Sequence, residues 1–130
     1  ESKINKYPTV DIWGTGKARR EFLYVDDMAR AAVHIMSLEK KIYDQNSQPM
    51  CSHINVGNGK DITISELAEM IRDVVNYSGQ INFDPTKPDG NLRKLMDSSR
   101  INNLGWKYDT GLREGLEKTY KNFLITHGSA

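Results

Sequence analysis

Residues 13–27, WGTGKARREFLYVDD, join a loop with two glycines and three cations to a short apolar run and then to an acidic helix start. Arginine guanidinium groups pair with phosphate oxygens through two parallel hydrogen bonds. Gly14 and Gly16 allow the backbone to approach a ligand closely, and Trp13 offers a flat apolar face to a base or a sugar. The segment is therefore able to hold an anion. An exposed turn with solvated charges is the alternative that these residues alone leave open.

The glycines of this loop do not form a dinucleotide-binding fingerprint. That motif requires a third glycine three residues after the second, and position 19 is an arginine. The loop thus gives no reason to expect a nicotinamide cofactor at this place in the chain.

Short apolar runs alternate with helical patterns along the rest of the chain. Strands are predicted over residues 7–13, 22–25, 52–57 and 81–83, with an extended segment over 92–96. Helices are predicted over residues 26–36, from Thr63 to about residue 77, over 100–104 and from Asp109 or Thr110 onward. Residues 43–50 are polar and are predicted to form a loop. The alternation indicates a mixed α/β fold.

The two longer predicted helices have clear start signals. Asp26 is predicted as an N-cap with Asp27 in the first turn, which explains this acidic pair without a catalytic dyad. Residues 63–66, Thr-Ile-Ser-Glu, match a capping box. The first helix has an apolar face suited to packing on a sheet, formed by Ala29, Ala32, Val33 and Met36.

Composition limits the class of protein and its surroundings. With 130 residues, 38% hydrophobic content and a formal charge of +1, one soluble globular domain is expected, and neither nucleic acid nor a membrane is an expected partner. The single cysteine, Cys51, excludes an internal disulfide and suits a reducing compartment. No segment resembles a signal peptide or a spanning helix, so a cytoplasmic location is expected. Because the chain begins at Glu1 without a methionine, it is predicted to be a fragment of a longer protein.

A second group of charged residues follows the predicted strand over 81–83. It consists of Lys87, Asp89, Arg93 and Lys94. If the strands bring this group and the loop at Trp13 to one edge, they form a cationic cleft with an aromatic wall and one carboxylate. Such a cleft suits a nucleotide diphosphate, because cations bind the pyrophosphate and a carboxylate binds ribose or sugar hydroxyls.

Motifs for catalysis are missing from the chain. There is no Tyr-x-x-x-Lys pair, no Gly-x-Ser-x-Gly elbow, and no histidine or cysteine cluster with metal-ligand spacing. We therefore expect no catalytic, cofactor-binding or metal-binding residue in this chain. One hypothesis from a different class is a non-catalytic module that binds a nucleotide or nucleic acid through the basic residues. The near-zero net charge argues against nucleic acid.

Four segments together carry a family resemblance. They are REFLYVDDM at residues 20–28, QPMCSHINVG at 48–57, KPDGNLRKL at 87–95 and LGW at 104–106. In this order the chain resembles the C-terminal part of the GDP-L-fucose synthases, a branch of the extended short-chain dehydrogenase/reductase family. The resemblance extends over essentially the whole chain, residues 1–130.

The resemblance implies an enzyme that converts GDP-4-keto-6-deoxymannose to GDP-L-fucose with NADP as cofactor. It implies that a preceding Rossmann domain holds the cofactor and the catalytic residues, so that this chain alone is inactive. Residues 1–130 then form the GDP-sugar binding lobe, with Trp13 and Arg20 as substrate contacts and Arg20 at the diphosphate. Asp89 is implied at a nucleoside hydroxyl and Lys94 as a second cation for the phosphates. Another epimerase or dehydratase, acting on a UDP- or dTDP-sugar, is the alternative within this class.

The resemblance also implies that two segments, 26–37 and 52–57, normally complete the Rossmann domain. Their apolar faces would lack a partner in this chain, and exposed apolar faces favour association. A homodimer is therefore expected.

Overall fold

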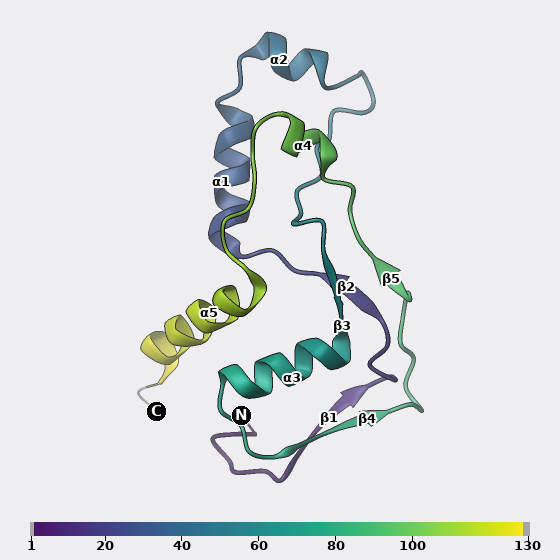
Figure 1. The fold of residues 1–130 in the computed structure, drawn as a ribbon, viewed down its shortest axis with the longest axis vertical. Helices are drawn as coiled ribbons and strands as arrows, with labels where there is room; N and C mark the ends of the chain where they lie inside the picture. The colour runs from purple at the N-terminus through teal and green to yellow at the C-terminus, as the bar shows by residue number, and fades with distance from the viewer. Residues whose placement is uncertain (1, 129–130) are drawn as a thin grey trace. The chain divides into compact units, whose positions relative to one another are not determined.

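The computed structural model describes residues 2–128, and its elements are drawn in Figure 1. The strands are β1 (Thr9–Trp13), β2 (Arg19–Glu21), β3 (Asp61–Thr63), β4 (Gln80–Asp84) and β5 (Arg93–Lys94). The helices are α1 (Val25–Met36), α2 (Lys40–Gln45), α3 (Ile64–Val74), α4 (Ser99–Asn103) and α5 (Leu112–His127). The predicted mixed α/β class is confirmed. No helix among the described residues has the length and apolarity needed to cross a membrane.

The chain divides into two compact units. The first unit contains residues 2–20, 61–94 and 113–128, and the second contains residues 21–60 and 95–112. Both segments that the family resemblance assigns to a Rossmann domain, 26–37 and 52–57, fall in the second unit. Their packing on a further domain stays a prediction.

The first unit is organised by parallel strand pairs. β1 pairs with β4 from Thr9↔Gln80 to Trp13↔Asp84, so the loops after both strands leave the same edge. β2 lies between β3 and β5, and its pairing with β5 is also parallel. The predicted capping box of α3 is confirmed: the Thr63 hydroxyl accepts from the Glu66 amide, and the Glu66 carboxylate accepts from the Thr63 amide at 2.9 Å. The register of the β1–β4 and β2–β5 pairings therefore sets which residues of the charged loops lie next to each other.

The second unit has a small apolar core. Ala31, Ile101 and Trp106 are buried, and five half-buried side chains pack around them, namely Leu23, Ile35, Ile54, Val56 and Tyr108. The predicted apolar stripe of α1 has no partner within this unit, as expected, since Val33 is 66% and Met36 is 85% exposed. The helix thus packs inside the unit through the face of Ala31 and leaves its predicted sheet-facing side open.

Two predicted strands are wrong. Residues 22–25 do not form one, because the strand ends at Glu21 and α1 begins at Val25. Residues 52–57 are also not a strand, although Ile54 and Val56 pack against the core of the second unit. Apolar side chains favour burial, but a strand also needs a backbone partner, and neither segment has a paired strand within residues 2–128.

Two further local predictions are corrected by the structure. The loop expected over 43–50 begins inside a helix, α2, whose last residues are Tyr43–Gln45. The final helix begins at Leu112 rather than at Asp109 or Thr110, and the amides of those two residues donate to Asp27.

Asp27 is a buried carboxylate rather than part of a helix cap. The N-cap of α1 is Tyr24 with no side-chain capping bond, so the prediction of Asp26 as the N-cap is wrong. Asp27 is 0% exposed and accepts hydrogen bonds from the amides of Asp109 at 3.3 Å and Thr110 at 2.9 Å. Arg30 forms an ion pair with it. Burial raises the pKa of Asp27, but these donors outweigh burial and hold the pKa below its usual value.

Replacing Asp27 with alanine should lower the free energy of unfolding of the second unit by about 1–3 kcal/mol, because buried amides lose their acceptor. Trp106 lies in the core of this unit, so urea denaturation followed by its fluorescence measures the loss. Asp26→Ala is the matched control: it removes an exposed carboxylate from the same helical turn and should cost less than about 1 kcal/mol. Equal losses in both variants would contradict the assigned role of Asp27.

The Asp27 contribution should also depend on pH. Because its folded pKa is lowered, the stability it provides is present above the ordinary value of 3.8 and is lost as the pH falls through the lowered value. The difference between the wild type and Asp27→Ala should therefore shrink below pH 3.8.

Candidate functional site

The turn over residues 87–90 is fastened to the loop after β1 by Asp89. One oxygen of Asp89, Oδ1, accepts a hydrogen bond from the Thr15 amide, and the other, Oδ2, accepts from the Thr15 hydroxyl, both at 2.6 Å. These bonds, with the Thr15 hydroxyl as the larger contribution, hold the pKa of Asp89 below its usual value. Each carboxylate oxygen has a further lone pair, so Asp89 can still accept from a ligand hydroxyl.

Gly14 is needed for this contact. Its φ of +87° lies in the left-handed region, and a Cβ atom at this position would stand 2.3 Å from Asp89 Oδ1 and 3.2 Å from Asp89 Cα. The Gly14 amide also donates to the Asp84 carbonyl at the end of β4, at 2.9 Å. The glycine thus allows the two loops to lie against each other directly above the paired ends of β1 and β4.

Trp13 and Lys87 form an exposed aromatic and cationic pair beside this contact. Trp13 is the last residue of β1 and is 73% exposed. The Lys87 ammonium lies 5.7 Å from the centre of the Trp13 ring, within the range of a cation–π interaction. The indole face is therefore accessible to a planar or apolar group of a ligand, with a positive charge next to it.

Arg20 and Lys94 are neighbours across two strands. They occupy paired positions of β2 and β5, so their side chains leave the same face of the sheet. Arg20 Nη1 donates to the carbonyl of Arg19 at 2.7 Å. Its Nη2 would lie 3.7 Å from a Cβ atom at Gly90, which places the guanidinium beside the turn that carries Asp89. No carboxylate pairs with Arg20 or Lys94 within residues 2–128.

The four residues singled out from the sequence thus gather on the first unit. The turn over 87–90 contacts Trp13 through Lys87 and the loop after Trp13 through Asp89, and its Gly90 lies beside the Arg20 guanidinium. Lys94 follows on the strand paired with that of Arg20. Their roles in ligand binding stay predictions. The arrangement combines an aromatic face, one carboxylate and two unpaired cations.

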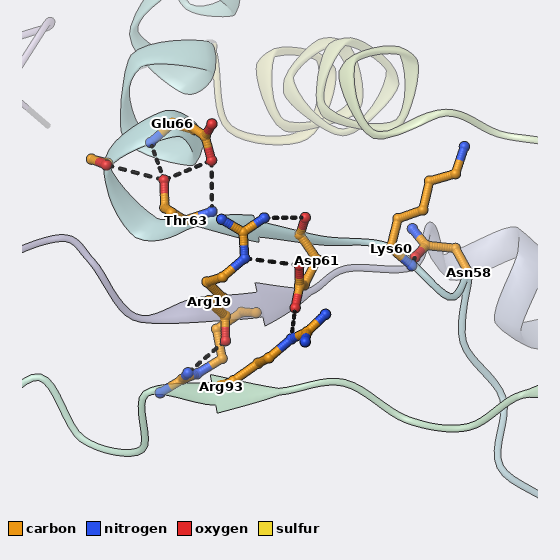
Figure 2. Close-up of polar contacts among 9 residues, drawn as sticks. Arg19, Asn58, Lys60, Asp61, Thr63, Glu66 and Arg93 are labelled. Carbon is orange, nitrogen blue, oxygen red and sulfur yellow. Dashed lines mark hydrogen bonds and ion pairs between the residues drawn. The ribbon is translucent and has the colours of Figure 1, made fainter.

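A second charged group lies on the other face of the β2–β5 pair, and its centre, Asp61, was not among the residues predicted from the sequence. Figure 2 shows Asp61 of β3 between Arg19 and Arg93. Arg19 Nε donates to Asp61 Oδ1 at 2.9 Å, and Arg93 forms an ion pair with Asp61 Oδ2. Arg93 first, and then Arg19, holds the pKa of Asp61 below its usual value. An isolated aspartate ahead of a capping box has no sequence pattern that reveals this role.

The described residues offer no metal centre. No group of three or more histidine, cysteine, aspartate or glutamate side chains within residues 2–128 is arranged to hold a metal ion. A Cβ atom at Gly14 would meet Asp89, and one at Gly16 would lie 2.6 Å from the Phe83 ring of β4. Both glycines therefore allow close packing around the end of β1.

Comparisons with known proteins agree on one class. Residues 2–57 match the NAD dependent epimerase/dehydratase family. The GDP-L-fucose synthase of Escherichia coli strain K12 is 50% identical over 124 residues, which are 95% of this chain and 39% of that protein. A GDP-D-glycero-L-gluco-heptose synthase from Campylobacter jejuni, solved in the presence of NADPH, superposes with a TM-score of 0.76 at 38% identity and covers 87% of this chain and 32% of its own.

A GDP-L-fucose synthetase from Naegleria fowleri bound to NADP has a TM-score of 0.77 at 25% identity over 99% of this chain and 38% of that one. Together these matches show that most of the chain is similar in sequence and fold to GDP-L-fucose synthases and to a GDP-heptose synthase. The chain spans less than two fifths of the length of each of these relatives.

Gly14→Ala should destabilise the first unit by more than the strain of a left-handed alanine, which is about 1–2 kcal/mol. The added methyl group must displace Asp89 and break its bonds to Thr15. Gly59→Ala is the control, because Gly59 has a similar φ of +73° and open space around its Cβ position. Thermal unfolding of the two variants measures the difference. A smaller loss at Gly14 than at Gly59 would show that the loop contact contributes nothing.

Proposed function

We propose that this chain is the GDP-sugar binding part of an NADP-dependent epimerase-reductase that converts GDP-4-keto-6-deoxymannose to GDP-L-fucose. The observation that carries the proposal is the cross-strand pair Arg20 and Lys94, two cations without a carboxylate partner in the described chain, beside the loop of Asp89. Two adjacent unpaired cations suit a diphosphate, which carries negative charge on two neighbouring groups.

The remaining site residues fit the rest of such a ligand. Trp13 supplies an exposed aromatic face, and Asp89 keeps an acceptor for a ribose or sugar hydroxyl next to it. The 50% identity to a GDP-L-fucose synthase supports GDP over UDP or dTDP as the nucleotide. Competition between GDP, UDP and dTDP for one labelled ligand separates the proposed substrate from the alternative sugar nucleotides.

In this proposal the chain contributes binding energy rather than chemistry. Binding of the GDP group, which does not react, holds the sugar in place. This positioning lowers the activation barrier of the reaction at the sugar. NADPH would supply hydride to the C4 ketone and be oxidised to NADP, as expected for a relative of proteins solved with NADP or NADPH. We propose that residues outside this chain hold the cofactor and transfer the protons, so that residues 1–130 alone are inactive.

Arg20→Ala should raise the KM for the GDP-sugar about ten- to a hundredfold in the full-length protein, because one charge-assisted contact to the diphosphate is worth about 1.5–3 kcal/mol. The kcat should stay near that of the wild type, because the diphosphate does not react. Oxidation of NADPH measures both constants. Arg72→Ala is the control: it removes a surface cation of α3 that pairs with Glu69 at 2.7 Å and should change neither. A lower kcat at unchanged KM would assign Arg20 to the chemistry instead.

We also propose that this chain forms a homodimer through the outer face of α1. That face carries Val33 and Met36, which are 66% and 85% exposed, and an apolar helical stripe of this kind favours burial. Light scattering of residues 1–130 at micromolar concentration should give twice the mass of 14.8 kDa, and Val33→Lys should return the monomer. A monomeric wild type would refute this assembly.

A further inference from the structure

The carboxylate of Asp61 connects all three strands of one sheet. It lies on β3, at one edge of the order β3-β2-β5, and binds Arg19 on the central strand and Arg93 on the opposite edge. Arg19 also donates from Nη2 to the Asp61 carbonyl at 3.1 Å. The Asp61 side chain is only 6% exposed, whereas the Arg93 side chain is 61% exposed. The Asp61 carboxylate therefore links side chains from all three strands, as Figure 2 shows for the labelled residues.

This contact lies on the opposite face from the candidate diphosphate site. Arg19 pairs with Arg93 and Arg20 pairs with Lys94 in consecutive rows of the β2–β5 ladder. Side chains alternate between the two faces of a strand, so the first row points toward Asp61 and the second row points away from it. Whatever fixes the first row in register also fixes the second.

The pairing of β2 with β5 needs a side-chain interaction that fixes its register. β5 has only two residues, and just before it the Arg19 amide donates to the Leu92 carbonyl at 2.8 Å. Both rows place like charges directly across from each other, and such pairs are destabilising. Asp61 offsets the repulsion in the first row, because both guanidinium groups share its charge. The second row has no carboxylate within residues 2–128 and keeps its charge for a ligand.

We propose that Asp61 is a positioning residue for diphosphate binding. Through Arg19 and Arg93 it holds β5 in register with β2, and the register sets the spacing of Arg20 and Lys94 on the far face. Asp61 itself does not contact the ligand. This inference rests on the proposed function, in that the ligand is a nucleotide diphosphate, but it adds a residue on the other side of the sheet to the binding machinery.

The test compares ligands with and without the diphosphate. In the full-length protein, Asp61→Asn should weaken the binding of GDP about five- to tenfold and leave the binding of guanosine unchanged, because only the phosphate contacts are misplaced. The amide of asparagine would turn a donor toward one of the two arginines, so the bridge is lost while the volume is kept. Isothermal calorimetry measures both ligands. Glu69→Gln is the matched control, since it breaks a surface ion pair with Arg72 in the same unit.

A second variant covers the case in which Asp61→Asn does not fold. Arg93→Gln removes only the exposed arm of the bridge and should weaken GDP binding about two- to fivefold, again without changing guanosine binding. The effect of either variant should vanish when Arg20 and Lys94 are both replaced by alanine, because the positioned cations are then absent. In kinetics, both variants should raise KM and leave kcat unchanged.

The outcomes separate this inference from the proposed function. If Asp61→Asn and Arg93→Gln leave GDP affinity unchanged while Arg20→Ala weakens it, the positioning role is refuted and the proposed function stands. Equal weakening of GDP and guanosine would also refute the positioning role, because it would indicate general structural damage. If the wild-type protein binds guanosine and GDP equally, the diphosphate site itself is wrong and the proposed function fails with it.

Discussion

The register between β2 and β5 is the constraint on which the candidate site depends. It is only two residues long, and it places Arg19 against Arg93 and Arg20 against Lys94. The backbone alone gives such a short ladder little stability, and its four cations oppose it. The buried carboxylate of Asp61 overcomes this opposition on one face. The other face is thereby left with two cations at paired positions of neighbouring strands, an arrangement that suits a diphosphate.

The loops at the ends of β1 and β4 complete the site by a second short contact. Asp89 binds Thr15 with both oxygens, and Gly14 leaves the space that this contact needs. Parallel pairing brings the two loops to the same edge, which explains how residues more than 70 positions apart meet. The first unit therefore combines two loops that are bonded to each other with exposed groups, Trp13 among them.

The sequence predicted what depends on local pattern and missed what depends on distant partners. Strand β4 and the capping box at Thr63 follow from alternation and from side chains three residues apart, and both were predicted. The strand expected over 22–25 lies instead over Arg19–Glu21, because its position is set by pairing with β5 and not by hydrophobicity. The candidate residues were found through their chemistry and the family resemblance. Asp61 was not, since its role appears only when three strands are brought together.

We propose that the cross-strand pair of Arg20 and Lys94 holds the diphosphate of a GDP-sugar. A crystal structure of the full-length protein with GDP bound tests this most directly. We expect phosphate oxygens within hydrogen-bond distance of both side chains, with the nucleoside on the side of Trp13 and Asp89. A diphosphate bound elsewhere, with Arg20 and Lys94 both facing solvent, would contradict it.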